Sequence, residues 1–205
     1  MQARNIVPAL LALLITALII WSGLSPVSRA VWYAEIIPVA SIFLLLVLTR
    51  LKFRFSTTAY VLMSVWLILH TVGAHYTFEH VPFDWGSHLL APWLGEGRNH
   101  FDRVAHYAIG FYSFPIAELL ARKRWANTFI AAIFGLLAVM SIAAAYEIIE
   151  WQYAVIEGGD AGAAFLGSQG DPWDAQKDML ADTLGALTAL VIFAFFKPRT
   201  EQKLF

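Results

Sequence analysis

The sequence predicts an all-α fold, a polytopic membrane helix bundle with about six transmembrane helices. Hydrophobic residues make up 59% of the 205-residue chain and charged residues only 14%, whereas a soluble domain carries about 25% charged residues. Apolar segments recur along the chain, each near the about 20 residues that cross the hydrocarbon core of a bilayer. The two signs of charge are segregated between the intervening loops. We expect residues 1–205 to form a single membrane domain.

The expected spans cover residues 6–21, 31–48, 57–72, 104–120, 127–146 and 179–196. Because lipid offers no hydrogen-bond partners to an exposed backbone, each span must be a helix. An alternative for the first segment is a cleaved signal peptide, in which Arg4 precedes an apolar core and Ser28-Arg29-Ala30 forms the cleavage site.

Lysine and arginine gather on one side of these spans, which the positive-inside rule makes cytoplasmic. This side contains the N-terminus, the loops after the second and fourth spans, and the C-terminus; its basic residues are Arg4, Arg50, Lys52, Arg54, Arg122, Lys123, Arg124, Lys197, Arg199 and Lys203. Both termini are then cytoplasmic. Tryptophans at the span ends agree with this frame, since tryptophan prefers the membrane interface; they are Trp21, Trp32, Trp151 and Trp173 outside and Trp125 inside.

The opposite, outer side collects the chemically active side chains. All six histidines fall there, as do all of the fifteen acidic residues except Glu118 and Glu201. Two long loops, at about 73–103 and 147–178, also lie on this side. Long loops in a small bundle are typically functional. We therefore expect a functional site at the outer face.

Three pairs of polar residues, each on a different span, are spaced so that the two members of a pair lie on the same face of their helix. Asp102 and His106 are four residues apart, as are Asp178 and Asp182, and Glu147 precedes Glu150 by three. Asp182 lies about one turn inside the membrane by this assignment. An ionised carboxylate at that depth costs several kcal/mol unless it is paired or binds a metal.

The repulsion among these acids requires a cation, protons or basic partners. We count only Arg103 and Lys177 as nearby basic residues, too few to neutralise the group. A divalent metal is therefore expected, and its oxygen and imidazole ligands suit zinc, manganese or iron. The predicted ligands are His75, Asp102, His106, Glu147, Asp178 and Asp182. Glu150 would be the general base toward water whose pKa the ion lowers.

Several of the other polar groups also have structural interpretations, which stay open at this point. Asp171 and Asp174 surround Pro172 and resemble the start of a helix. His70 could bond a neighbouring backbone, and Glu35 could be interfacial. His80, His88 and His100 are expected to be solvated or interfacial in their loops, and Arg103 to pair with a loop carboxylate or extend to the interface.

The motifs HTVGAHY (70–76), NHFDRVAH (99–106), YEIIEW (146–151) and QGDPWDAQKD (169–178) resemble the YjdF-like inner-membrane family, DUF2238. This resemblance covers the whole length and implies a multi-pass protein of the bacterial inner membrane, without an established activity. A weaker resemblance is to VanZ-like membrane proteins, associated with glycopeptide tolerance. Asp182 departs from that pattern, which has an asparagine there, so the chemistry inferred from VanZ-like proteins is in doubt.

Our leading functional hypothesis is a metal-dependent, membrane-embedded enzyme that acts at the periplasmic face on a lipid or lipid-linked envelope molecule. The alternatives are a proton-coupled transporter, because intramembrane acids also relay protons, and an accessory or structural membrane protein. The absence of cysteine excludes disulfides, thiolate metal sites and cysteine nucleophiles. No basic patch suited to nucleic acid is evident, so membrane lipid is the expected partner.

Overall fold

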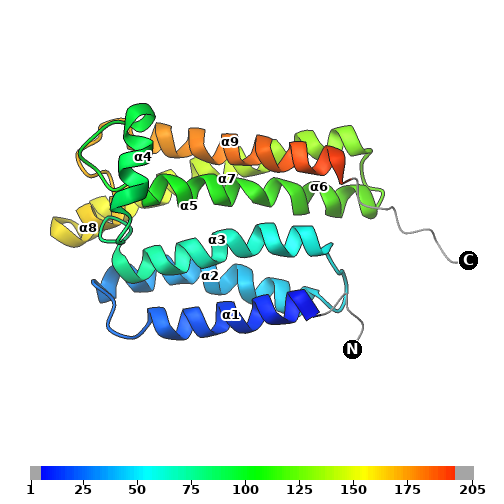
Figure 1. Cartoon of the computed structure of the whole chain (residues 1–205), viewed down its shortest axis with the longest axis horizontal. Helices are drawn as coiled ribbons and strands as arrows, with labels where there is room; N and C mark the ends of the chain where they lie inside the picture. Colours follow the sequence, from blue (N-terminus) through cyan, green and yellow to red (C-terminus); the bar gives the residue numbers. More distant parts are fainter. Residues whose placement is uncertain (1–5, 197–205) are drawn as a thin grey trace, which may run out of the picture.

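The computed structural model describes residues 6–196, and every regular element in that range is helical. The elements are α1 (Ile6–Ser22), α2 (Arg29–Thr49), α3 (Thr57–Tyr76), α4 (Asp84–Leu94), α5 (Phe101–Ile109), the 3₁₀ turn η2 (Gly110–Tyr112), α6 (Ser113–Arg122), α7 (Thr128–Glu157), α8 (Gly159–Leu166) and α9 (Asp174–Phe195). The long helices lie side by side along one axis (Figure 1). The all-α prediction is confirmed.

Four of the helices, α2, α3, α7 and α9, are long and apolar enough to cross a membrane, and α1 is a shorter apolar helix. The predicted fourth span, 104–120, is divided into α5, η2 and α6, which follow one another along a single line in Figure 1. A membrane bundle is therefore the architecture of the described chain. The count of six spans stays a prediction.

Helices α7 and α9 extend furthest beyond the predicted spans toward the acidic loops. Helix α7 continues beyond residue 146 to Glu157, because apolar residues continue its helical pattern until Gly158, whose φ of 66° ends the helix. Helix α9 begins at Asp174 rather than at residue 179. As a result, Glu147, Glu150 and Asp178 lie on regular helix, where their side-chain directions are fixed.

The bundle has two distinct ends. The polar end contains the loops 23–28, 77–100 and 158–173, together with α4 and α8; the basic end contains the loops 50–56 and 123–127. Both ends of the described chain lie at the basic end (Figure 1). Arg4, Lys197, Arg199 and Lys203 are outside the described residues, so the cytoplasmic location of the termini stays a prediction.

The lateral surface of the bundle is apolar, as is typical of a protein surface that contacts lipid. Large hydrophobic side chains on several helices are more than half exposed, among them Leu13, Leu48 and Phe129. A soluble monomer rarely exposes apolar area on this scale. The interior between α3, α6, α7 and α9 contains small and aromatic residues, such as Ala59, Phe114 and Ala189.

Helices α5 and α9 approach backbone to backbone at two glycines. A Cβ atom on Gly185 would overlap the carbonyl oxygen of Tyr107, and one on Gly110 would overlap that of Asp182. Small residues allow such close crossings of membrane helices. The Ser113 hydroxyl donates to the Ala186 carbonyl at 3.0 Å in the same crossing. This contact brings the polar residues one turn away on each helix together.

A buried acid at the basic end is bonded on all sides. The Glu118 carboxylate accepts hydrogen bonds from the Ser56 amide at 2.7 Å, the Ser56 hydroxyl at 2.6 Å and Arg122 at 2.6 Å. Ser56 also caps α3, because its hydroxyl accepts from the Ala59 amide. We call these three residues, Ser56, Glu118 and Arg122, the Glu118 knot. It connects α6 to the start of α3.

Candidate functional site

The contact between α5 and α9 assembles four of the predicted residues, which we call the acid–histidine cluster: Asp102, His106, Asp178 and Asp182. Asp102 and His106 lie on α5, one turn apart, and Asp178 and Asp182 lie one turn apart on α9. Asp178 and Asp182 are almost fully buried. The equal spacing on two closely packed helices is the reason that all four side chains meet.

The two ring nitrogens of His106 face different carboxylates. Nδ1 lies 3.3 and 3.4 Å from the two oxygens of Asp182. Nε2 lies 3.6 Å from Asp102 Oδ1 and 3.9 Å from Asp178 Oδ1. A proton on Nδ1 is donated to Asp182, which leaves the Nε2 lone pair directed toward the other two aspartates.

Asp102, His106 and Asp178 each offer one donor atom, and these atoms lie within 4.8 Å of one another. Among residues 6–196 they are the one group of three His, Asp or Glu side chains with this geometry. Donor atoms about 2.0–2.2 Å from a tetrahedral zinc ion are themselves about 3.3–3.6 Å apart. The distances from His106 Nε2 to the two carboxylates, 3.6 and 3.9 Å, are slightly longer than this, and the three donor atoms lie within 4.8 Å of one another, so the side chains would have to move closer together to coordinate one ion.

Two glutamates on α7 border the cluster. Glu147 is near enough to interact electrostatically with His106, Asp178 and Asp102. Its Oε1 atom is buried and accepts no hydrogen bond from any residue in the described part of the chain. Glu150, one turn further along α7, is buried and lines a cavity together with Asp102, His106 and Asp182.

Two arginines neutralise part of the acidic charge, which corrects the expectation that Arg103 and Lys177 are the only bases at hand. Arg98 and Arg103 each lie 2.5 Å from Asp174 Oδ1, and Arg103 also contacts Asp178. Arg98 is further 3.7 Å from Asp102. Sequence analysis missed Arg98, although its position four residues before Asp102 was a signal for such a pair.

Asp171, in the loop before α9, pairs with Lys177 on α9 and lies 3.8 Å from Arg98 and 3.5 Å from Arg103. Lys177 lies 2.6 Å from Asp171, and the Trp173 amide donates to the same carboxylate at 3.0 Å. The hydrogen bond from Lys177 holds the pKa of Asp171 below its ordinary value. Asp171 therefore forms a turn before α9 and is not the N-cap that the sequence suggested, because Trp173 occupies the N-cap position.

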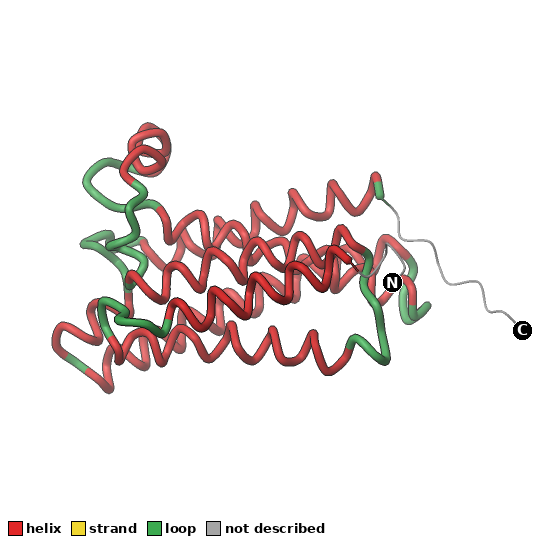
Figure 2. Tube along the Cα trace, turned by 60° about the horizontal axis from the view of Figure 1, so that its bottom comes forward, coloured by secondary structure: helices red, strands yellow, loops and turns green. Residues whose placement is uncertain are grey.

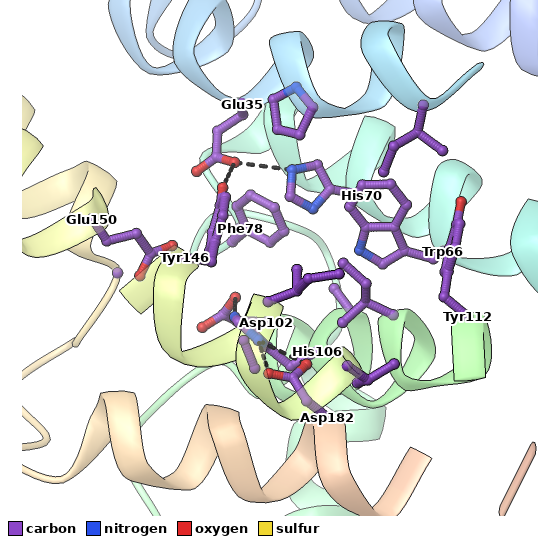
Figure 3. A pocket seen from close by; sticks show the side chains of 18 of the residues that line it. Glu35, Trp66, His70, Phe78, Asp102, His106, Tyr112, Tyr146, Glu150 and Asp182 are labelled. Atoms are coloured by element: carbon purple, nitrogen blue, oxygen red, sulfur yellow. Dashed lines mark hydrogen bonds and ion pairs between the residues drawn. The ribbon is translucent and has the colours of Figure 1, made fainter. Parts of the chain in front are cut away.

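A cavity of about 170 Å³ opens beside the acid–histidine cluster. Its apolar walls come from α2, α3, α5, α6, α7 and α8, and include Ile42, Trp66, Ile116, Val139 and Phe165. Its polar groups gather toward the polar end of the bundle, where Asp102, His106 and Asp182 form one side (Figure 3). The cavity thus combines a charged rim with an apolar interior.

Buried Glu35 and His70 and half-buried Tyr146 form the opposite side of the cavity. Glu35 on α2 lies 3.0 Å from His70 Nε2, and the Tyr146 hydroxyl donates to the same Glu35 oxygen at 2.9 Å (Figure 3). The interpretations of Glu35 as interfacial and of His70 as bonded to backbone are wrong. Their separation by thirty-five residues on two apolar helices carried no signal that the two side chains meet.

His75 lies apart from the cluster. Its Nδ1 atom is 2.9 Å from the Ser22 carbonyl oxygen, and its ring stacks on Trp21 at a centroid distance of 4.4 Å. The structure therefore separates His75 from the other predicted ligands, because the helical turn at the end of α3 directs it toward α1. Its contacts join α3 to α1.

His100 is fully buried, which corrects the expectation of a solvated loop residue. Its Nε2–H donates to the Gly95 carbonyl at 2.8 Å, and its backbone amide donates to the Ser87 hydroxyl at 3.0 Å. Burial lowers the pKa of His100. This histidine therefore attaches α4 to the start of α5.

Comparison with known proteins identifies the family. A family model described as "Predicted membrane protein (DUF2238)" matches residues 7–199. The chain belongs to the DUF2238 family. One relative, described as "Inner membrane protein YjdF" from Escherichia coli (strain K12), is 33% identical over 207 residues, which cover 98% of this chain and 97% of that protein. No solved structure matches the chain.

The DUF2238 match includes all four motifs on which the resemblance was based, and with them every residue of the acid–histidine cluster. With the apolar helices and an inner-membrane relative, it makes this chain a multi-pass protein of the bacterial inner (plasma) membrane. The family description assigns no reaction. The weaker resemblance to VanZ-like proteins stays untested.

Proposed function

We propose that this protein is a metal-dependent, membrane-embedded enzyme that acts at the periplasmic face on a lipid or lipid-linked envelope substrate. One observation carries the proposal: His106 Nε2 faces two carboxylates, on Asp102 and Asp178, at the rim of an apolar cavity. A histidine with two aspartates is a ligand set for zinc, manganese or iron, and an apolar cavity suits a lipid.

The two sides of the His106 ring supply different functions in this site. Asp102, His106 Nε2 and Asp178 are the ligands. Asp182 accepts the Nδ1–H and so orients the ring, as carboxylates behind metal-bound histidines commonly do. Asp182, which the sequence predicted to be a ligand, would therefore orient His106 and not bind the metal. His75 leaves the ligand set because its ring is engaged with Ser22 and Trp21.

Glu147 would complete the site as a fourth ligand if its carboxylate moved closer, because it lies outside the group of donor atoms that are within 4.8 Å of one another. Its buried Oε1 has no hydrogen-bond partner among residues 6–196, and an unpaired buried carboxylate oxygen is costly. An ion held by Asp102, His106 and Asp178 would supply the missing partner. Arg103, which contacts Asp178, fixes the direction of that carboxylate and reduces the net charge of the site.

Glu150 is the general base. It is buried, lines the same cavity as Asp102 and His106, and is not one of the ligands. A divalent ion held by these ligands would lower the pKa of water and polarise an ester or phosphoryl oxygen of the substrate. A carboxylate at this position accepts the proton of the attacking water.

The cavity determines which substrates can enter. A buried cavity of about 150 Å³ lined by apolar residues holds a benzene molecule, so 170 Å³ accommodates the part of a lipid next to its head group. The apolar residues Ile42, Ile116 and Val139 would contact the chain, and the acidic rim would face the head group.

The test uses protein reconstituted in nanodiscs made from bacterial inner-membrane lipids. Incubation with zinc or manganese, followed by lipid mass spectrometry, is expected to yield a hydrolysed lipid product. Glu150→Gln is the matched variant: it should keep the metal and lose product formation. Equal product formation by the wild type and Glu150→Gln, or product from empty nanodiscs alone, would remove the enzymatic proposal.

A proton-coupled transporter is the rival that uses the same groups, because Glu35, His70 and Tyr146 continue the polar side chains across the cavity. Against it, Glu118, the one acid in the basic half of the described spans, is fully bonded in the Glu118 knot. Uptake into proteoliposomes driven by a pH gradient would favour the transporter. Unchanged function after alanine substitution throughout the cluster would favour an accessory role.

A further inference from the structure

Helix α4 differs from every long helix of the bundle in its direction. It runs across the bundle axis at the polar end (Figure 1), and the turned view shows it standing out from the side of the bundle (Figure 2). Within residues 6–196 it packs extensively against no other helix. A helix across the bundle axis lies parallel to the plane of a membrane that the bundle spans.

The sides of α4 have different surroundings. The side toward the protein contains buried Gly86, which packs on Phe83, and half-buried Ser87, which accepts a hydrogen bond from His100. A second side, with Asp84 and His88, lines an open polar groove. These small and polar residues of α4 thus lie on two of its sides.

The third side is an apolar stripe, formed by Trp85, Leu89 and Trp93. These residues are spaced four apart, so they lie above one another on the helix. They are 72%, 61% and 76% exposed, respectively. Two indole rings and a leucine in a single row are too large an apolar surface to face water without a partner.

Other exposed tryptophans mark the level at which α4 lies. Trp21 at the end of α1, Trp151 near the end of α7 and Trp173 just before α9 are all exposed at the polar end. Indole side chains collect at the boundary between acyl chains and head groups. Exposed tryptophans on or beside three helices at the polar end thus indicate the membrane interface, and the stripe on α4 adds two more indole rings at this end.

We propose that α4 is an interfacial helix whose Trp85–Leu89–Trp93 stripe is embedded at the boundary between the head groups and the acyl chains of the bilayer at the polar end. Its partner is phospholipid. Amphipathic helices with one aromatic side and one polar side bind membrane surfaces in this orientation. The side with Asp84 and His88 then faces water, which agrees with its open polar groove.

The position of α4 also bears on the candidate site. Both ends of α4 are bonded to His100, through Ser87 and Gly95. His100 directly precedes α5, which carries Asp102 and His106. An α4 embedded at the interface therefore holds these two residues at head-group depth. The inference does not depend on metal binding or on catalysis.

The chain contains no cysteine, so single cysteines can be introduced and spin-labelled without background. Leu89→Cys tests the stripe, and the neighbouring His88→Cys is the matched control on the groove side. Both full-length variants are reconstituted in phospholipid vesicles, and power saturation measures the accessibility of each label to oxygen and to a water-soluble nickel chelate. Oxygen concentrates in the acyl region, and the nickel chelate stays in water.

We expect the label at residue 89 to be several-fold more accessible to oxygen than to nickel, and the label at residue 88 to show the reverse. Equal nickel accessibility at the two positions would overturn the proposal, because the stripe would then face water. Exclusion of both reagents at residue 89 would also overturn it, because a protein surface would then cover the stripe. Trp93→Cys repeats the measurement if Leu89→Cys does not fold.

Discussion

The Glu118 knot at the basic end and the acid–histidine cluster at the polar end both bury acidic side chains, but they satisfy them differently. Glu118 accepts three short hydrogen bonds, from the backbone and side chain of Ser56 and from Arg122. In the cluster, Glu147 keeps a buried oxygen without a partner among the described residues, and His106 lies 3.3–3.9 Å from three carboxylates.

The comparison separates a structural buried acid from a functional one. A buried carboxylate with a full set of donors stabilises the fold in which it lies, because those donors replace the lost water. A cluster that has more acids than nearby bases, and that borders a cavity, keeps carboxylate oxygens with which it could bind a cation. The next predictions test whether stability depends on the first region and ligand binding on the second.

The largest effect on stability is expected from Glu118→Ala. This change removes the buried carboxylate that accepts from the Ser56 amide, the Ser56 hydroxyl and Arg122, and removing one partner of a buried pair typically costs about 3–5 kcal/mol. Chemical unfolding in detergent measures the loss of unfolding free energy. Bound metal, measured on the folded fraction, should be unchanged. A loss below about 1 kcal/mol, the range of a surface pair, would remove the distinction between the two regions.

The next effect is expected from Gly185→Ala, which forces α5 and α9 apart because its Cβ would overlap the Tyr107 carbonyl oxygen. Overpacking of this kind costs about 1–3 kcal/mol, and it separates His106 from Asp178 and Asp182. Both unfolding free energy and metal content should fall. The exposed neighbour Leu184 provides the control, Leu184→Ala, which should retain the metal. Full metal binding by Gly185→Ala would contradict the role of this helix contact.

A smaller stability effect is expected from Asp182→Asn. The change removes one negative charge from an acidic cluster, which offsets the weakened bond to His106, so the unfolding free energy should shift by no more than about 1 kcal/mol. Metal affinity should fall about 10–100-fold, as it does when a carboxylate behind a histidine ligand is replaced. Isothermal titration of the metal-free protein with zinc measures it. A large stability loss with unchanged affinity would make Asp182 structural.

The smallest effect concerns pH. Burial lowers the pKa of His100 below its ordinary 6.5, so the unfolded chain binds a proton near pH 6.5 that the folded chain does not. The stability contributed by neutral His100 is therefore present above this pH and is lost as the pH falls below it. Thermal unfolding of the wild type between pH 7.5 and 5.5 should show a steeper decline than that of His100→Asn. Equal slopes would show that His100 does not titrate in this way.

The fold and part of the site could be predicted from the sequence. Apolar runs predicted the helices, because a chain in lipid must bond its own backbone. The four-residue spacing of Asp102 with His106 and of Asp178 with Asp182 predicted shared faces, and the packing of α5 on α9 brought them together. Sequence spacing was therefore sufficient to predict a contact where both residues lie on neighbouring turns of the same helix.

Contacts between distant helices could not be predicted in the same way. Glu35 meets Tyr146 across the cavity, and Arg98 meets Asp174, although neither pair has a sequence spacing that indicates contact. His75 was assigned to the site because it lies at the polar end of α3, but its direction on the last helical turn leads it to Ser22. The depth of a residue along a span can be predicted from the sequence. The direction in which its side chain points around the helix axis cannot, because that direction depends on how the helices pack.

Metal content, determined by elemental analysis of the purified protein, tests the central claim most directly. We expect about one divalent ion per chain in the wild type and in His75→Gln, since His75 lies outside the cluster, and none in His106→Gln. Wild-type protein without bound metal after equilibration with zinc, manganese and iron would contradict the account. Retention of the ion by His106→Gln would contradict it equally.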